Sequence, residues 1–123
     1  MREQALSVPF TISAATSFLA LHAFETGRET CVEFLGITDA GERRVRIKFV
    51  RCISAKLLGY GRTPVHGSLC EVLESSWVDE AIRAQQRLFP DSSNTAASLR
   101  HFVLRGHDSQ VEVLADDFAW EFF

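Results

Sequence analysis

Apolar and polar side chains alternate along residues 18–52, which is the pattern of β-strands with one buried face. Residues 43–52 show it most clearly, because Val45, Ile47 and Phe49 are separated by polar or charged residues. Two further alternating stretches, 18–24 and 31–37, come before it. The short segments between the three stretches each contain a glycine and are typical of turns. The pattern predicts a three-stranded antiparallel meander over 18–52.

The connecting turns also predict a register for this meander. Four-residue connections at 26–29 and 39–42 bring Leu21, Phe34 and Ile47 together on one face, whereas a shift by one residue would scatter the apolar set. The same register predicts a polar row on the other face, formed by His22, Glu33 and Lys48. Such a row is either a cross-strand charge ladder or a carboxylate that holds a histidine ready as a general base. We favour the ladder, which is far commoner.

One segment has clear helical periodicity, residues 77–89. Its apolar residues recur at three- and four-residue intervals, and Asp79 and Glu80 lie in the first turn, where the helix dipole favours negative charge. Ser76 is the expected N-cap, and Pro90 ends the helix. Before it, 53–58 is expected to continue the sheet after a bend, and 68–75 alternates like a further strand.

The C-terminal part of the chain predicts a β-hairpin. Strands 99–105 and 110–115 flank a turn at 106–109, and this spacing pairs Phe102 with Val113 and Leu104 with Val111. The His107-Asp108 pair at the tip has the alternative interpretation of two metal ligands. We favour the turn, because a metal needs further ligands and the other histidines show no ligand spacing: His22, His66 and His101. The tail is expected to remain extended to residue 122.

These elements together predict an α+β fold for a single domain of residues 1–123. The expected architecture is a mostly antiparallel β-sheet, made of the meander 18–52 and a C-terminal hairpin 99–122, with one main α-helix at about 77–89 packed on it. At 123 residues, 46% of them hydrophobic, the chain can bury one adequate core but not two.

The net charge of −3 hides an asymmetry between two parts of the chain. Residues 42–62 carry seven basic groups against one acidic group, net +6, and residues 71–123 carry four arginines against ten acidic groups, net −6. The two parts are expected to face one another, within the fold or across a dimer. The alternative is that the basic strand 43–51 stays open for nucleic acid, which the overall acidity disfavours.

The sequence also carries signals of compartment. No apolar run reaches the roughly 18 residues that a membrane span requires, and residues 1–24 do not have the pattern of a secretion signal. The cysteines are odd in number and widely spaced, which disfavours a disulfide framework or a zinc site: Cys31, Cys52 and Cys70. A reducing, cytoplasmic location is the resulting expectation.

The stretch Gly59–Gly67, GYGRTPVHG, is the first candidate for a ligand site. Two glycines allow close backbone approach, and Tyr60, Arg62 and His66 together suit a small anionic ligand such as a carboxylate or phosphate. The stretch is neither a dinucleotide-binding fingerprint nor a phosphate-binding P-loop. Read structurally, it is a long irregular connection, and this second interpretation is favoured.

The aromatic tail is the second candidate. A small core does not readily absorb so many aromatic side chains at one end of a chain, and we therefore predict a homodimer interface there, formed by Phe118, Trp120, Phe122 and Phe123.

The sequence favours a non-enzymatic binding or interaction module that binds itself or another protein. It shows no catalytic constellation, since G-x-S-x-G is absent and the cysteines lack an activating electropositive setting. No metal, cofactor or membrane association is expected. The alternative is a small enzyme or anion-binding protein that uses Tyr60 as a wall, Arg62 as the anion anchor and His66 as acid or base. Nucleic-acid binding through 43–51 is the third and weakest option.

Overall fold

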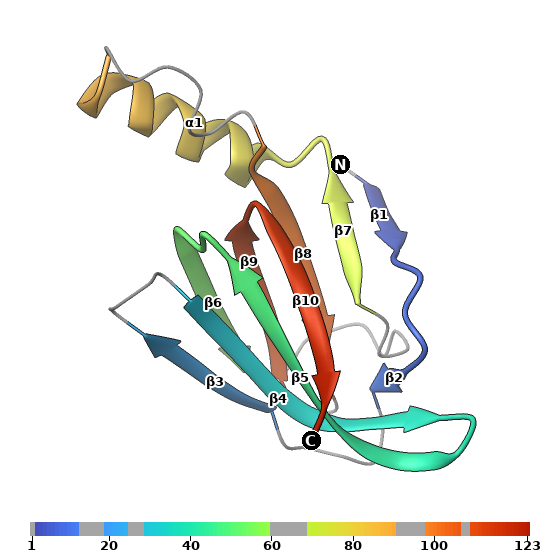
Figure 1. The fold of residues 1–123 in the computed structure, drawn as a ribbon. Coiled ribbons are helices and arrows are strands. Elements are labelled where there is room, and N and C mark those ends of the chain that lie inside the picture. Colours follow the sequence, from blue (N-terminus) through green and yellow to red (C-terminus); the bar gives the residue numbers. More distant parts are fainter. Residues whose placement is uncertain (1, 13–18, 25–28, 60–68, 91–97, 107–108) are drawn as a thin grey trace.

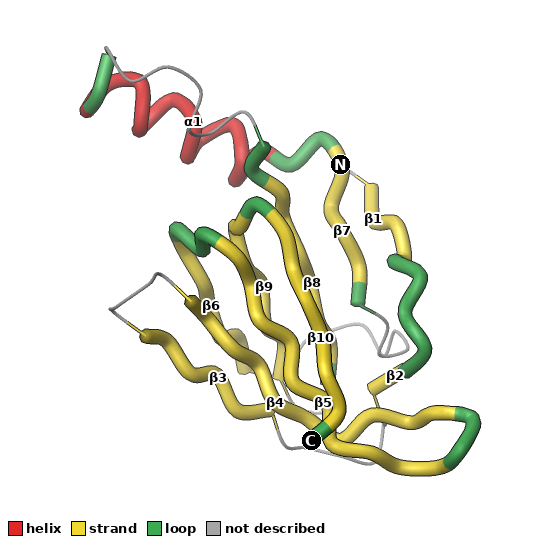
Figure 2. The backbone as a smooth tube through the Cα atoms, viewed as in Figure 1, coloured by secondary structure: helices red, strands yellow, loops and turns green. Residues whose placement is uncertain are grey.

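A computed structural model of the chain describes residues 2–12, 19–24, 29–59, 69–90, 98–106 and 109–123. Strands dominate this part of the chain, and the helix is a minor element (Figure 2). In chain order the elements are β1 Arg2–Ala5, β2 Thr11–Ile12, β3 Leu19–Phe24, β4 Glu29–Thr38, β5 Gly41–Val50, β6 Ser54–Gly59, β7 Cys70–Leu73, α1 Ser76–Leu88, β8 Arg100–Arg105, β9 Ser109–Ala115 and β10 Asp117–Phe122. The prediction of a mostly antiparallel sheet is confirmed.

The strands form two antiparallel sheets that face each other (Figure 1). The first has the order β1-β7-β8-β9-β6, and the second has the order β10-β5-β4-β2, with β3 also paired to β4. Side chains from both sheets form one apolar core, and the rings of Phe49 and Phe102 meet across it at 5.4 Å. Burial of these alternating apolar residues between two layers is what the hydrophobic effect requires of amphipathic strands.

The meander of β3, β4 and β5 forms, but its register is shifted by two residues from the predicted one. Thr38 pairs with Gly41, so the connection has two residues rather than four, and Val32 faces Ile47 and Phe34 faces Val45. Gly41 has φ +102°, a conformation that favours glycine, and the Thr38 hydroxyl donates to the Gly41 carbonyl oxygen at 2.9 Å. A shift by an even number keeps every side chain on its predicted face.

The predicted polar row does not form, because of this shift. Glu33 lies opposite Arg46 on one side and Ala20 on the other. Lys48 lies opposite Cys31, which in turn faces His22. The predicted row of His22, Glu33 and Lys48 is therefore wrong as to its members. A cross-strand charge ladder is formed instead by Glu33, Arg46 and Glu121.

The C-terminal hairpin is confirmed for β8 and β9, which pair Phe102 with Val113 and Leu104 with Val111. Its tip, residues 107–108, lies outside the described residues. The tail does not extend this hairpin to 122 as predicted. The chain bends at Asp116, and β10 crosses to the second sheet, where it pairs antiparallel with β5.

Helix α1 does not pack on a sheet face, contrary to the prediction. None of its residues is buried, and it extends away from one end of the two sheets (Figure 1). The second sheet covers the core face that the helix was expected to cover. The N-cap is Ser75 rather than Ser76, since the Ser75 hydroxyl accepts a hydrogen bond from the Val78 backbone N–H. Among the described residues no helix has the length and apolar character needed to cross a membrane.

Candidate functional site

The predicted ligand-binding residues Tyr60, Arg62 and His66 lie outside the described residues, within 60–68. Their role stays a prediction. Two other places bring functional side chains together, the strand β10 with its neighbour β5 and the junction between β7 and α1.

The aromatic residues of β10 face the opposite sheet. Phe118, Trp120 and Phe122 lie opposite Phe49, Ile47 and Val45 of β5, which point into the core. Phe118 packs edge-on against Phe102 of the first sheet, with ring centroids 5.4 Å apart. Phe118 and Phe122 are thus partly absorbed by the core of this chain, which the sequence interpretation did not foresee.

Trp120 and Phe123 remain more accessible than these two, with 38% and 47% of their surface exposed. Trp120 packs against Phe10 at 5.5 Å and Phe122 at 5.1 Å but keeps its outer part open to solvent. Arginines stack on the neighbouring rings, Arg43 on Phe122 and Arg46 on Phe123, each 4.2 Å from the ring centroid. Aromatic and arginine side chains are also the types enriched in protein interfaces.

The basic strand β5 pairs much of its charge with acidic side chains inside the fold. Arg46 contacts Glu33 at 2.9 Å and Glu121 at 3.0 Å, and Lys48 lies 3.6 Å from Glu121. The hydrogen bond from Arg46 is the main reason why the pKa of Glu121 lies below its ordinary value, and Lys48 adds to it. Arg51 is paired with Asp116. The basic part and the acidic tail therefore face one another within the chain, one of the two arrangements expected from the charge asymmetry.

The backbone of β10 offers one open edge. The Phe123 N–H donates to the Arg44 carbonyl at 3.1 Å, so the odd-numbered residues of this antiparallel pair direct their N–H and C=O groups toward β5. The backbone groups of Phe118, Trp120 and Phe122 therefore point away from β5. No other described strand pairs with this side of β10. An edge of this kind is a template for pairing with another chain.

The second place is a hydrogen-bonded chain of three side chains from three segments. The Ser75 Oγ, just before α1, lies 2.7 Å from Nδ1 of His101 on β8. Nε2 of His101 lies 2.7 Å from Oε1 of Glu112 on β9, and the Gln110 amide donates to the other carboxylate oxygen at 3.2 Å. Ser75 and His101 are only 4% and 6% exposed. The order hydroxyl, imidazole, carboxylate is that of an acid–base relay.

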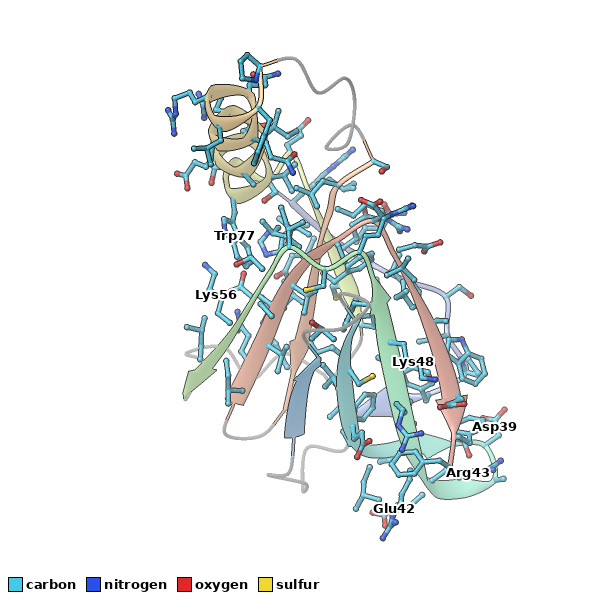
Figure 3. The ribbon with its side chains drawn as sticks, turned by 60° about the vertical axis from the view of Figure 1, so that its left-hand side comes forward. Asp39, Glu42, Arg43, Lys48, Lys56 and Trp77 are labelled. Atoms are coloured by element: carbon cyan, nitrogen blue, oxygen red, sulfur yellow. The ribbon has the colours of Figure 1, made fainter. Side chains whose placement is uncertain are left out.

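Trp77, in the first turn of α1, covers these three hydrogen-bonded side chains. Its ring meets the His101 ring edge-on at 5.1 Å, and the Lys56 ammonium lies 4.0 Å from its centroid. Figure 3 shows Trp77 pointing from the helix toward Lys56, with Lys48 on the opposite side of the molecule. The surface at β10 and β5 is therefore separate from the site of Ser75, His101 and Glu112.

The site of Ser75, His101 and Glu112 could be predicted in part from the sequence. In the predicted hairpin register, which the structure confirms, His101 pairs with Leu114 and Glu112 pairs with Val103. His101 and Glu112 are therefore diagonal neighbours on the same face of the sheet. Ser75 joins them only because β7 pairs with β8, opposing Val72 to His101. That pairing is non-local, and no local pattern reports it.

Within the described part of the chain, no group of three or more histidine, cysteine or acidic side chains is arranged to hold a metal ion. Comparisons with protein-family models, with curated protein sequences and with solved structures found no match for the chain.

Proposed function

We propose that this chain is a cytoplasmic interaction module that self-associates through the open edge of β10. The observation that carries the proposal is a strand edge with which no other described strand pairs, beside two accessible aromatic side chains, Trp120 and Phe123. The cytoplasmic location rests on the odd, widely spaced cysteines.

The arrangement of charged side chains favours a second copy of this chain as the partner of the β10 edge. When two β10 strands pair antiparallel about a two-fold axis at Trp120, the outward backbone groups of the two Trp120 residues meet, and those of Phe118 lie opposite Phe122 of the other copy. The Phe118 N–H, which donates to Asp117 Oδ1 at 2.8 Å in the single chain, exchanges that partner on pairing. Glu121 of one copy then lies opposite the small Ala119 of its partner, and the partner's Lys48 comes next in the same row. Opposite charges thus align across the contact, and the two Trp120 side chains become cross-strand neighbours.

The test compares substitutions on two exposed strand edges. Trp120→Lys places a charge at the centre of the proposed contact, whereas Leu57→Lys places one on β6, an edge strand of the other sheet, where Leu57 is 53% exposed. In sedimentation velocity at about 10 to 100 µM, a range suited to a modest interface, we expect a dimer for the wild type and Leu57→Lys and a monomer for Trp120→Lys.

The contrary outcomes are equally specific. A monomeric wild type over that range contradicts self-association, and a dimer disrupted by Leu57→Lys but not by Trp120→Lys moves the contact to β6. Circular dichroism of each variant checks that the β-sheet signal is kept, because Trp120 also packs on Phe10.

The alternative of a small enzyme or anion-binding protein using Tyr60, Arg62 and His66 remains a prediction. Nucleic-acid binding through strand 43–51 is disfavoured by the acidic partners of Arg46, Lys48 and Arg51.

A further inference from the structure

The turn between β7 and α1 has an unusual backbone. β7 ends at Leu73, Glu74 has φ +57°, and Ser75 follows immediately before the helix. A residue other than glycine at positive φ is uncommon, and backbone strain of this kind is found preferentially at functional sites. A sharp, strained turn from strand to helix is also where many hydrolases hold a nucleophilic serine. Ser75 lies in such a turn although the sequence lacks G-x-S-x-G.

The hydrogen bonds around Ser75 define the direction of proton transfer. A carboxylate only accepts, so Glu112 takes a hydrogen bond from Nε2–H, and in the neutral imidazole the Ser75 hydroxyl donates to Nδ1 while Ser75 Oγ accepts from the Val78 N–H at 3.2 Å. In this tautomer Nδ1 is the nitrogen that can take the Ser75 proton. Relative to a serine protease, the two ring nitrogens have exchanged partners, but base and orienting carboxylate keep their order.

We propose that Ser75 is a nucleophile, activated by His101, that accepts the acyl group of small, uncharged esters. The slight exposure of Ser75 and His101 favours a short acyl group. The Glu112 carboxylate behind the imidazole disfavours an anionic substrate such as a phosphate ester. The N-terminus of α1 supplies positive potential beside Oγ, which stabilises the negative charge that develops during attack. This activity is independent of the proposed self-association through β10, which lies on the other sheet.

The reaction balances with water as the only other reactant. Ser75 Oγ forms a bond to the acyl carbon while its proton passes to His101 Nδ1, and the bond between that carbon and the alcohol oxygen breaks. His101 returns the proton to the departing alkoxide. Water then attacks the acyl-serine, with His101 again taking and returning the proton, and the carboxylic acid leaves. Glu112 accepts the Nε2–H hydrogen bond and holds the imidazolium in place.

The test uses p-nitrophenyl acetate with the full chain. Release of p-nitrophenolate is followed by absorbance, and peptide mass mapping locates the acetyl group. We expect acetylation of Ser75 in the wild type, and a rate lower by about a hundredfold or more in His101→Gln, which removes the base. Ser75→Asn removes the nucleophile but keeps a good helix N-cap, so loss of acetylation at this position is not a loss of the helix. Ser76→Ala, at the exposed neighbouring serine, is expected to react like the wild type.

Glu112 acts through His101 as a positioning residue, and two variants separate this role from packing. Glu112→Gln keeps the size of the side chain and removes its charge, whereas Glu112→Asp keeps the charge and shortens the side chain. We expect Glu112→Asp to retain more of the acetylation rate. A folded wild type that acquires no acetyl group on Ser75 overturns the proposal, as does an unchanged rate of Ser75 acetylation in His101→Gln. Either result leaves the oligomeric state measured for β10 unaffected.

Discussion

At the scale of single residues, Gly36 shows how closely the second sheet packs against the segment before β2. A Cβ atom at this position would lie 2.7 Å from Val45 Cγ2 and 3.4 Å from Phe10 Cβ. Val45 is fully buried and has no room to move. Gly41 differs, since its φ of +102° requires glycine although no atom lies within 4 Å of an added Cβ. Position 36 therefore requires glycine for lack of space, and position 41 requires it for the backbone conformation.

We expect Gly36→Ala to lower the free energy of unfolding by about 1–3 kcal/mol, the usual cost of overpacking a core. The double variant Gly36→Ala/Val45→Ala checks the cause, because the space left by Val45 accommodates the new methyl group. Its loss of stability in urea unfolding is expected to be smaller than the sum of the two single losses. Strict additivity would show that the Val45 contact is not the reason for glycine.

At the scale of elements, β10 and α1 are held in opposite ways. β10 pairs with β5 along its whole length and adds ion pairs through Glu121. α1 is joined to the sheets mainly at its first turn, through Ser75 and Trp77, and its far end leaves Leu88 and Phe89 exposed. Amide exchange is therefore expected to be slower in β10 than in the last turn of α1.

The pairing of Glu121 makes part of the stability depend on pH. Its pKa in the folded chain is lowered from the ordinary value of 4.5, first by the hydrogen bond from Arg46 and then by the charge of Lys48. A lowered folded pKa means that the stabilisation is complete above pH 4.5 and is lost as the pH falls through the folded value. Arg46 also contacts Glu33, at 2.9 Å.

Glu121→Gln tests this dependence. Its unfolding free energy is expected to lie below that of the wild type at neutral pH, and the two curves are expected to converge as the pH falls below 4.5. The difference is small, because the pair is exposed and solvent screens it. Curves that stay parallel from pH 7 to pH 2, measured by urea unfolding, would contradict a contribution from the ionised carboxylate.

At the scale of the whole molecule, an ion-paired cluster joins the two sheets at one end. Arg100 on β8 makes two hydrogen bonds to Glu71 on β7, at 2.8 and 3.0 Å, and a third to Asp117 on β10 at 3.2 Å. The hydrogen bonds that Arg100 donates to Glu71 are the main reason why the pKa of Arg100 is raised above its ordinary value. Arg100 also lies over the Phe102 ring, 4.8 Å from its centroid. Because Asp117 belongs to the other sheet, one guanidinium contacts both layers.

Removal of Arg100 is expected to destabilise the fold by about 1–3 kcal/mol, since it leaves the half-buried Glu71 carboxylate without this partner. Arg100→Lys keeps the charge but not the two parallel hydrogen bonds, and we expect an intermediate loss. Arg83→Ala on the exposed side of α1 is the control and is expected to change stability by less than about 0.5 kcal/mol. Thermal and urea unfolding measure all three, and equal stability of Arg100→Ala and the control would contradict the role of the cluster.

The sequence alone was enough to predict the strands with alternating side chains, because their apolar face is buried in the core wherever the strand lies in the sheet. It therefore predicted the β8–β9 register and the buried faces of β4 and β5, and it located the helix to within one residue at each end. It misjudged the connection at Asp39 and Ala40 by two residues, because the choice between a short and a long turn changes no side-chain face.

Only the tertiary structure decided which strands lie side by side. Non-local contacts brought β10 to β5 and β7 to β8, and thereby placed the tail on the second sheet and Ser75 beside His101. The same contacts left α1 outside the core, because a second sheet already covered the face that an amphipathic helix would have filled. Local patterns determine which side of an element is apolar, but the partner for that side is selected by the packing of the whole chain.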